Sequence, residues 1–134
     1  MSIRFLTVAE VTALHDAGLG LYGGETGLVA GEGLLESAVM APQAGTADGY
    51  LHADLFEMAA AYLYHIVLDH PFMDGNKRAG CAAAMTFLKL NGRVPFLAAS
   101  RLRDLAIQVQ THRLSKRAIA AALRGPRKRR PRKR

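Results

Sequence analysis

Five side chains capable of acid–base, metal-binding or phosphate-binding chemistry lie within the segment HPFMDGNKRAG, residues 70–80. They are His70, Asp74, Asn76, Lys77 and Arg78. His70 is the only histidine of the segment, and histidine is the side chain whose unperturbed pKa suits a general base near neutral pH. Asp74 offers carboxylate oxygens of the kind that hold Mg²⁺ beside phosphate oxygens. This mixture indicates chemistry on a phosphate group.

The backbone around the segment supports the same interpretation. An apolar run precedes it and the small-residue run AGCAAAM follows it, so we expect a helix to end before the motif and another to begin near Asn76. The first N–H groups of a helix have no partner within it, and the helix dipole favours an anion there. Lys77 and Arg78 in that first turn oppose the dipole but are well placed for a phosphate. Gly75 lets the backbone approach a ligand closely.

Each of these residues also has a purely structural interpretation. His70 alone could be a C-terminal histidine that interacts favourably with a helix dipole. The pair Asp74-Gly75 is typical of an ordinary turn, and Lys77 and Arg78 could be solvated surface charges. Phe72 is expected to anchor the loop in the core under either interpretation. The joint occurrence of a base, a metal ligand and cations in this order favours the functional one.

Other site motifs are absent from the sequence or weak. It contains neither G-x-x-x-x-G-K-[ST] nor H-E-x-x-H, and no G-x-G-x-x-G follows a strand. His65, Asp69 and His70 could be considered as metal ligands, but a zinc site is disfavoured because Cys81 stands alone. His65 is expected to be a packed, hydrogen-bonded core histidine. The remaining histidines are expected at the surface or at an interface: His15, His52 and His112.

The elements that must position the motif are predicted to be helices. Thr7 with Glu10 forms a capping box for a first helix that should stop at Gly18, and residues 19–33 form a glycine-dense loop with at most a short extended piece. A short helix over 32–42 should end at Pro42, and a turn-rich link follows over 43–50.

The second half of the chain continues this pattern. An almost wholly apolar segment over 52–69 predicts a central helix, and a further helix should cover 76–90. Residues 93–96 could form an extended link or hairpin arm. Ser100 and Ser115 are the expected N-caps of two last helices. We therefore predict a compact all-α bundle of about six helices.

Composition limits the domain organisation. Seven of the eighteen Lys and Arg residues of this 134-residue chain lie in residues 125–134, which leaves eleven bases and eleven acids in residues 1–124. We expect one catalytic domain over 1–124 and a disordered basic tail over 125–134 that is either merely solvated or contacts nucleic acid. The single cysteine excludes an internal disulfide, and no leader or membrane-spanning segment is evident, so we expect a cytoplasmic protein.

The motif HPFMDGNKR resembles the signature of the Fic/Doc superfamily, H-P-F-x-[DE]-G-N-[GK]-R. The wider segment LYHIVLDHPFMDGNKRAGCAAAMTFLKLNG, and ALHDAGLGLYGGETGL near the N-terminus, resemble its death-on-curing (Doc) branch, so the likeness extends over residues 5–124. Lys77 stands where the adenylylating members carry a second glycine, and Cys81 stands where they carry a second arginine. Both differences favour the Doc branch.

The resemblance implies a toxin of a type II toxin–antitoxin pair, a kinase that moves the γ-phosphate of ATP onto a threonine of elongation factor Tu and stops translation. His70 would be the general base and Asp74 the Mg²⁺ ligand. Asn76, with the backbone amides at the start of its helix, would cradle the transferred group. Gly75, Asn76, Lys77 and Arg78 would bind the nucleotide, while Asp69 stays open as an alternative metal ligand.

The same resemblance implies where a protein substrate and an antitoxin would bind. The loop from Tyr22 to Gly33 would be a flap that docks the protein substrate. The inhibitory motif [ST]-x-x-x-E-[GN] has no match here, so the antitoxin is expected to be a separate chain whose C-terminal segment folds onto an exposed apolar groove. Two alternatives stay open: an adenylyl transferase with the same residues in the same roles, or an inert module that binds nucleic acid through the basic tail.

Overall fold

The computed structural model describes residues 2–126 and contains six α-helices within them. They are α1 (Val8–Tyr22), α2 (Gly33–Met40), α3 (Leu55–Asp69), α4 (Asn76–Leu90), α5 (Ala99–Gln110) and α6 (Lys116–Arg124). A 3₁₀-helix (Ala41–Gln43) follows α2, and a small antiparallel hairpin of β1 (Gly45–Thr46) and β2 (Gly49–Tyr50) precedes α3. The prediction of an all-helical bundle is confirmed.

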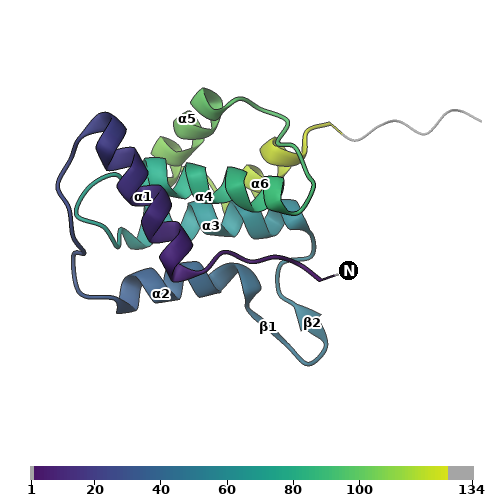
Figure 1. The fold of residues 1–134 in the computed structure, drawn as a ribbon. Coiled ribbons are helices and arrows are strands. Elements are labelled where there is room, and N and C mark those ends of the chain that lie inside the picture. The colour runs from purple at the N-terminus through teal and green to yellow at the C-terminus, as the bar shows by residue number, and fades with distance from the viewer. Residues whose placement is uncertain (1, 127–134) are drawn as a thin grey trace, which may run out of the picture.

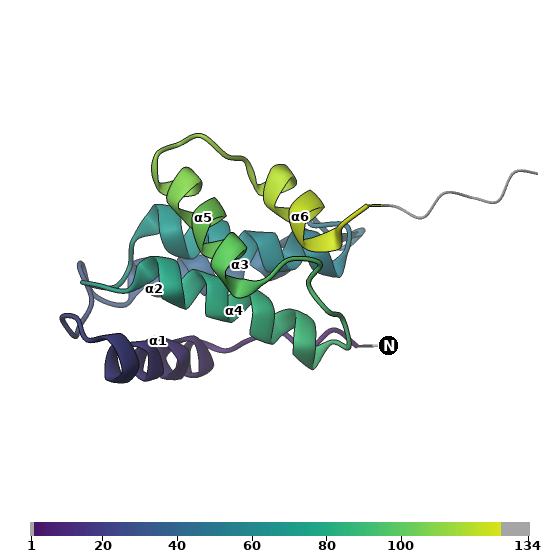
Figure 2. The ribbon, with the colours of Figure 1, turned by 90° about the horizontal axis from the view of Figure 1, so that it is seen from above.

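Helices α3 and α4 form the centre of the bundle (Figures 1 and 2). Helix α1 packs on α4 from one side, α5 and α6 lie on the other, and α2 runs along α3. Helix α3 is buried nearly all round, as its apolar sequence predicts. Its buried residues are Met58, Ala59, Ala60, Ala61, Tyr62, Leu63, Ile66 and Val67.

The small-residue run at the start of α4 explains how closely the two central helices pack. A Cβ atom on Gly80 would lie 3.2 Å from both the Leu63 carbonyl oxygen and the Val67 Cγ2 atom, which is tighter than ordinary packing. Glycine at this position therefore lets the backbone of α4 approach α3. This contact fixes the positions of the two helix ends that the loop 70–75 connects.

The predicted N-terminal cap of α1 is confirmed, but its predicted end is wrong. The Thr7 hydroxyl accepts a hydrogen bond from the Glu10 N–H, and the Glu10 carboxylate accepts one from the Thr7 N–H. The helix continues through Gly18 to Tyr22 and ends at Gly23, whose φ of 76° only glycine adopts readily. A single glycine inside a helix costs only about 1 kcal/mol, so Gly18 does not stop it.

Three other boundaries differ from the sequence prediction. Pro42 does not end the helical path, because it fits the second position of the 3₁₀-helix. Ser100 lies inside α5, whose N-cap is Ala98 and makes no side-chain bond, whereas Ser115 caps α6 as predicted. Of the two alternatives predicted for residues 93–96, the structure shows a link between α4 and α5 and not a hairpin arm. Helix α3 begins at Leu55, behind an Asp54 cap, rather than at residue 52.

The molecule has two distinct ends (Figure 1). The N-terminus and the hairpin lie at one end, while the loop 23–32 and the loop 70–75 meet at the other. The tail predicted to be disordered covers residues 125–134. Gly125 is the C-cap of α6, with its N–H bonded to the Ala121 carbonyl oxygen, while residues 127–134 lie outside the described residues. No helix within the described range has the length and apolar character required to cross a bilayer.

Candidate active site

The motif forms the loop between the two central helices, and both ends of the loop are left-handed. His70 is the C-cap of α3 with φ 52° and ψ 56°, and its N–H donates to the Ile66 carbonyl oxygen at 3.2 Å. Gly75, with φ 80°, is the N-cap of α4. A left-handed conformation is unfavourable for residues other than glycine, and strained backbone conformations cluster at functional sites although they also occur in ordinary turns. His70 is exposed and lies directly beside the start of α4.

Asn76 closes the loop from within. Its side-chain oxygen accepts the Phe72 N–H at 3.0 Å, and its side-chain nitrogen donates to the Phe72 carbonyl oxygen at 2.8 Å. The residue is only 4% exposed. The side-chain amide of Asn76 therefore shapes the loop. What Asn76 offers a ligand is its backbone N–H, which has no partner within the helix.

Phe72 anchors the loop in the core, as predicted. It packs against His15, which the sequence analysis expected at the surface or at an interface. Phe72 is 2% exposed and His15 4% exposed. Their rings stack at a centroid distance of 3.7 Å with an interplanar angle of 5°. His15 Nε2 donates to the Asp74 carbonyl oxygen at 2.7 Å. The prediction for His15 was wrong, although its position four residues after the buried Val11 places it on the inner face of α1.

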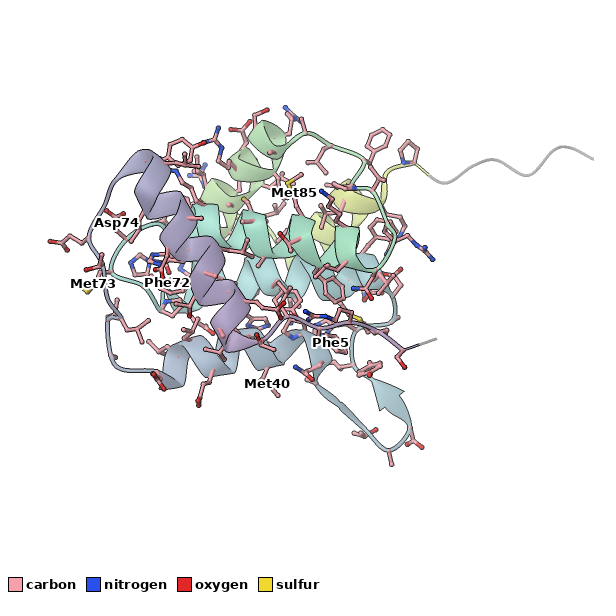
Figure 3. All side chains as sticks on the ribbon, in the orientation of Figure 1. Phe5, Met40, Phe72, Met73, Asp74 and Met85 are labelled. Carbon is pink, nitrogen blue, oxygen red and sulfur yellow. The ribbon has the colours of Figure 1, made fainter. Side chains whose placement is uncertain are left out.

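The glycine-rich loop after α1 pairs with the motif through its backbone. Met73 N–H donates to the Gly27 carbonyl oxygen and Val29 N–H to the Pro71 carbonyl oxygen, each at 2.9 Å, which creates an isolated β-bridge between Leu28 and Phe72. The predicted short extended piece of this loop is thus confirmed. Figure 3 shows Met73 and Asp74 where the two loops meet, at the end of the molecule beyond α1.

The Asp74 carboxylate lies between the two loops and is exposed. One oxygen accepts the Gly75 N–H at 2.9 Å, and the other accepts the Glu25 N–H at a longer 3.4 Å. A Cβ atom on Gly24 would lie 2.9 Å from this second oxygen, so glycine is required for the loop to come this close. Asp74 is a wall residue of the cleft beside the motif, whereas Asp69 is not, which favours Asp74 as the candidate metal ligand.

A cleft of about 490 Å³ gathers the motif residues predicted from the sequence: His70, Asp74, Gly75, Asn76, Lys77 and Arg78. Its opposite wall comes from α5, and sequence reasoning had assigned no residue of that helix to the site. These additional residues are Ser100, Arg103, Asp104, Ile107 and Gln110. No sequence signal identifies them, because only the packing of α5 on α4 brings them to the motif.

The two motif cations are held in different ways. Lys77 Nζ donates to the Gln110 side-chain oxygen at 2.9 Å, so this ammonium group leans toward the end of α5. The Arg78 guanidinium lies over the Tyr22 ring, 4.3 Å from its centroid, in a cation–π contact. Both cations line the cleft at the N-terminus of α4, where they can neutralise an anion.

A second hollow, an apolar groove of about 390 Å³, adjoins the cleft between α1, α4 and α5. Leu14, Leu19 and Leu21 line it from α1, and Cys81 and Met85 from α4. Burial raises the pKa of the Cys81 thiol to about 12, while the nearby charge of Arg103 acts in the opposite direction. The thiol is therefore protonated at neutral pH and is no nucleophile.

Two further histidines lie away from the cleft, around Lys116. The ammonium group of Lys116 lies 3.1 Å from His65 Nε2 and 3.4 Å from His52 Nε2. Burial, followed by the charge of Lys116, lowers the pKa of His65 to about 4. His65 is half-buried and hydrogen-bonded, as predicted, but His52 is buried and not at the surface. His112 is exposed, as predicted.

Comparison with known proteins supplies independent information. The Fic/DOC family matches residues 5–88. The protein kinase doc of Escherichia phage P1 is 35% identical over 122 residues, which cover 91% of this chain and 94% of that protein. The toxin Doc of Mycolicibacterium smegmatis is 40% identical over 112 residues, which cover 81% of this chain and 85% of that protein.

Proposed function

The chain belongs to the Fic/DOC family and resembles its Doc members along most of its length, and from that premise we propose that it is a Doc-like toxin that transfers the γ-phosphate of ATP to a protein hydroxyl. The observation that carries the proposal is the shared cleft, in which His70, Asp74 and the cation-bearing N-terminus of α4 face one space. Residues 1–124 would form the catalytic domain. The proposed substrate hydroxyl is a threonine of elongation factor Tu.

His70 acts as the general base in this proposal. Its imidazole takes the proton of the target hydroxyl while the hydroxyl oxygen forms a bond to the γ-phosphorus. The bond between that phosphorus and the oxygen bridging to the β-phosphate breaks, and ADP leaves with the bonding electron pair. The left-handed conformation of His70 turns the residue away from the path of α3 and toward the start of α4.

The N-terminus of α4 provides the charge stabilisation. Phosphoryl transfer is mainly a matter of positioning and neutralising the oxygens of the moving group. The free backbone N–H groups at the start of the helix, starting with that of Asn76, face those oxygens, and Lys77 and Arg78 add positive charge. Gly75 adopts the left-handed conformation that directs the chain into the start of α4, with φ 80°, which glycine accepts readily.

Mg²⁺ fits the donor set at Asp74. Magnesium bound with a nucleotide needs only one or two protein carboxylates, because phosphate oxygens and waters complete its coordination. Asp74 provides one exposed carboxylate in the cleft, with one oxygen bonded to the Gly75 N–H at 2.9 Å and the other in a longer 3.4 Å contact with the Glu25 N–H. When bound, the ion would neutralise phosphate oxygens. The role of the protein is to hold Asp74 beside the start of α4, which the His15 contact does.

Protein partners would bind at two neighbouring places. The loop 23–32 already runs antiparallel to the motif through backbone bonds, which supports its role as the flap that docks the target segment. The apolar groove between α1, α4 and α5 fits an amphipathic segment of a separate antitoxin chain. Such a segment would lie directly beside Arg78, which lines both hollows, and would thereby block the cleft.

Intact-protein mass spectrometry of elongation factor Tu, after incubation with this protein, ATP and Mg²⁺, tests the proposal. We expect a phosphoryl increment that is absent with His70→Ala. An adenylyl increment would support the alternative transferase. Without any increment on this factor, the same measurement on a bacterial lysate distinguishes another substrate from an inactive protein. The inert nucleic-acid module predicts full growth arrest by His70→Ala and its loss on deletion of residues 125–134.

A further inference from the structure

Arg103 of α5 occupies a special place between the two hollows. Only three residues line both the cleft and the groove, and they are Gly75, Arg78 and Arg103. Gly75 and Arg78 belong to the motif, whereas Arg103 comes from a helix 25 residues further along the chain than Arg78. Arg103 therefore lines the same cleft as the N-terminus of α4 but comes from another helix.

The charge of Arg103 is not used within the fold. Arg4 is paired with Glu10 and Arg124 with Asp54, but the side chain of Arg103 forms no hydrogen bond or ion pair with any residue in the described range 2–126. Arg103 is exposed. The one acidic residue that α5 contributes to the cleft within the described range is Asp104, which is its chain neighbour. Fold stability therefore does not account for a cation at this point.

The other cations of the cleft are partly engaged. Lys77 is bonded to Gln110, and Arg78 lies over Tyr22. The polyphosphate of a nucleotide carries several negative charges. The N-terminus of α4, together with two cations that already have partners, does not neutralise all of them. A guanidinium offers a planar set of donors that fits phosphate oxygens in a bidentate way. Arg103 is the cation of the described cleft that is free to do so.

We propose that Arg103 binds the polyphosphate of the nucleotide from the α5 wall, opposite the motif. This inference rests on the proposed function, since it assigns a further residue to the same nucleotide site. It makes α5 part of the active site, and it gives the cleft a positive group on each side of the phosphate chain. Arg103 is a binding residue here and takes no part in proton transfer.

Calorimetric titration with ATP and Mg²⁺, in the His70→Ala background so that no transfer occurs, tests the proposal. Arg103→Ala should weaken ATP binding by about tenfold to a hundredfold, the usual cost of losing hydrogen bonds to a charged group. Arg103→Lys keeps the charge but loses the paired guanidinium donors, so its ATP affinity should lie between those of the parent and of Arg103→Ala. Arg101→Ala is the matched control, because Arg101 is an exposed arginine of the same helix outside the cleft.

Inorganic triphosphate as a competing probe separates phosphate binding from a general structural effect. Arg103→Ala should weaken triphosphate binding by the same factor as ATP binding, with an unchanged melting temperature. Unchanged ATP affinity in Arg103→Ala, with weaker binding in Arg78→Ala, would overturn the role of Arg103 alone and leave the proposed function intact. An absence of ATP binding in the parent protein would overturn both.

Discussion

Helices α3 and α4 have the same length of 15 residues and pack against each other, yet they begin in opposite ways. At the start of α3, the Asp54 carboxylate accepts the Glu57 N–H at 2.8 Å, and Glu57 places a negative charge in the first turn. Both features stabilise a helix N-terminus. The start of α4 has Gly75 without a side-chain cap, and Lys77 and Arg78 in its first turn.

The difference shows where stability has been given up for chemistry. The first-turn cations of α4 oppose its dipole, and the first residue of the loop, His70, is held in an unfavourable backbone conformation. The start of α3 follows the usual preferences for a capping side chain and negative charge at a helix N-terminus, whereas the start of α4 does not. Such departures are expected at functional sites. Substitutions at the two helix starts should therefore separate activity from stability.

The largest effect is expected for His70→Gly. Loss of the general base should lower the transfer rate by about 10²-fold to 10⁴-fold. Glycine accepts the left-handed conformation without strain, so the free energy of unfolding should rise by up to about 1 kcal/mol. Transfer assays and denaturant unfolding measure both quantities.

His112→Gly is the matched control for this change. His112 is the other described residue besides glycine with positive φ, at 58°, and it lies outside the cleft. It should show a similar stability change with full activity. Retained activity in His70→Gly, or an equal loss in His112→Gly, would contradict the assignment of the base.

Charge reversal by Lys77→Glu should produce the next largest effect. Lys77 is proposed to neutralise phosphate oxygens, so its loss should reduce the turnover by about 10²-fold. A negative charge in the first turn of α4 improves the interaction with the dipole by about 0.3–1 kcal/mol, which offsets the lost bond to Gln110. Thermal unfolding should therefore show an equal or higher melting temperature.

Arg101→Glu makes the same reversal in the first turn of α5, outside the cleft. It should leave turnover unchanged and the melting temperature equal or higher. If Lys77→Glu instead lowers stability and leaves turnover intact, Lys77 stabilises the fold and has no part in catalysis, which would contradict the difference drawn between the two helix starts.

Asp54→Ala tests the other helix start. It removes the cap of α3 and the partner of Arg124, which should cost about 1–2 kcal/mol of unfolding free energy. Asp54→Asn keeps the cap and should lose about half as much. Activity per folded molecule should stay unchanged in both variants, and urea unfolding with parallel transfer assays measures this. A loss of activity without a loss of stability would contradict the separation of roles.

The smallest effect concerns the pH dependence of stability, to which His65 of α3 should contribute. The pKa of His65 is about 4 in the folded protein and 6.5 without burial, so the unfolded chain binds the proton more readily. Stability should fall as pH drops from 6.5 toward 4. The melting temperature of His65→Gln should fall less over this range. The ion pair of Glu10, whose pKa is lowered to about 2, weakens only at lower pH.

The sequence predicts the site as far as its residues are contiguous. Residues 70–78 could be interpreted together because one loop and one helix start carry them all. His15 and Arg103 could not be found in this way, since they join the site only when α1 and α5 pack on α4. Gly18 and Ser100 misled the prediction because each has a local preference that the longer helix around it overrides.

The most direct test of the central claim compares the transfer of label from γ-labelled and α-labelled ATP to elongation factor Tu, with His70→Ala as the control. We predict that only the γ-labelled ATP transfers label, and that His70→Ala transfers none. Label from the α-position would show that the cleft transfers an adenylyl group. γ-Label that persists undiminished in His70→Ala would contradict the role of His70 and, with it, the proposed mechanism at the start of α4.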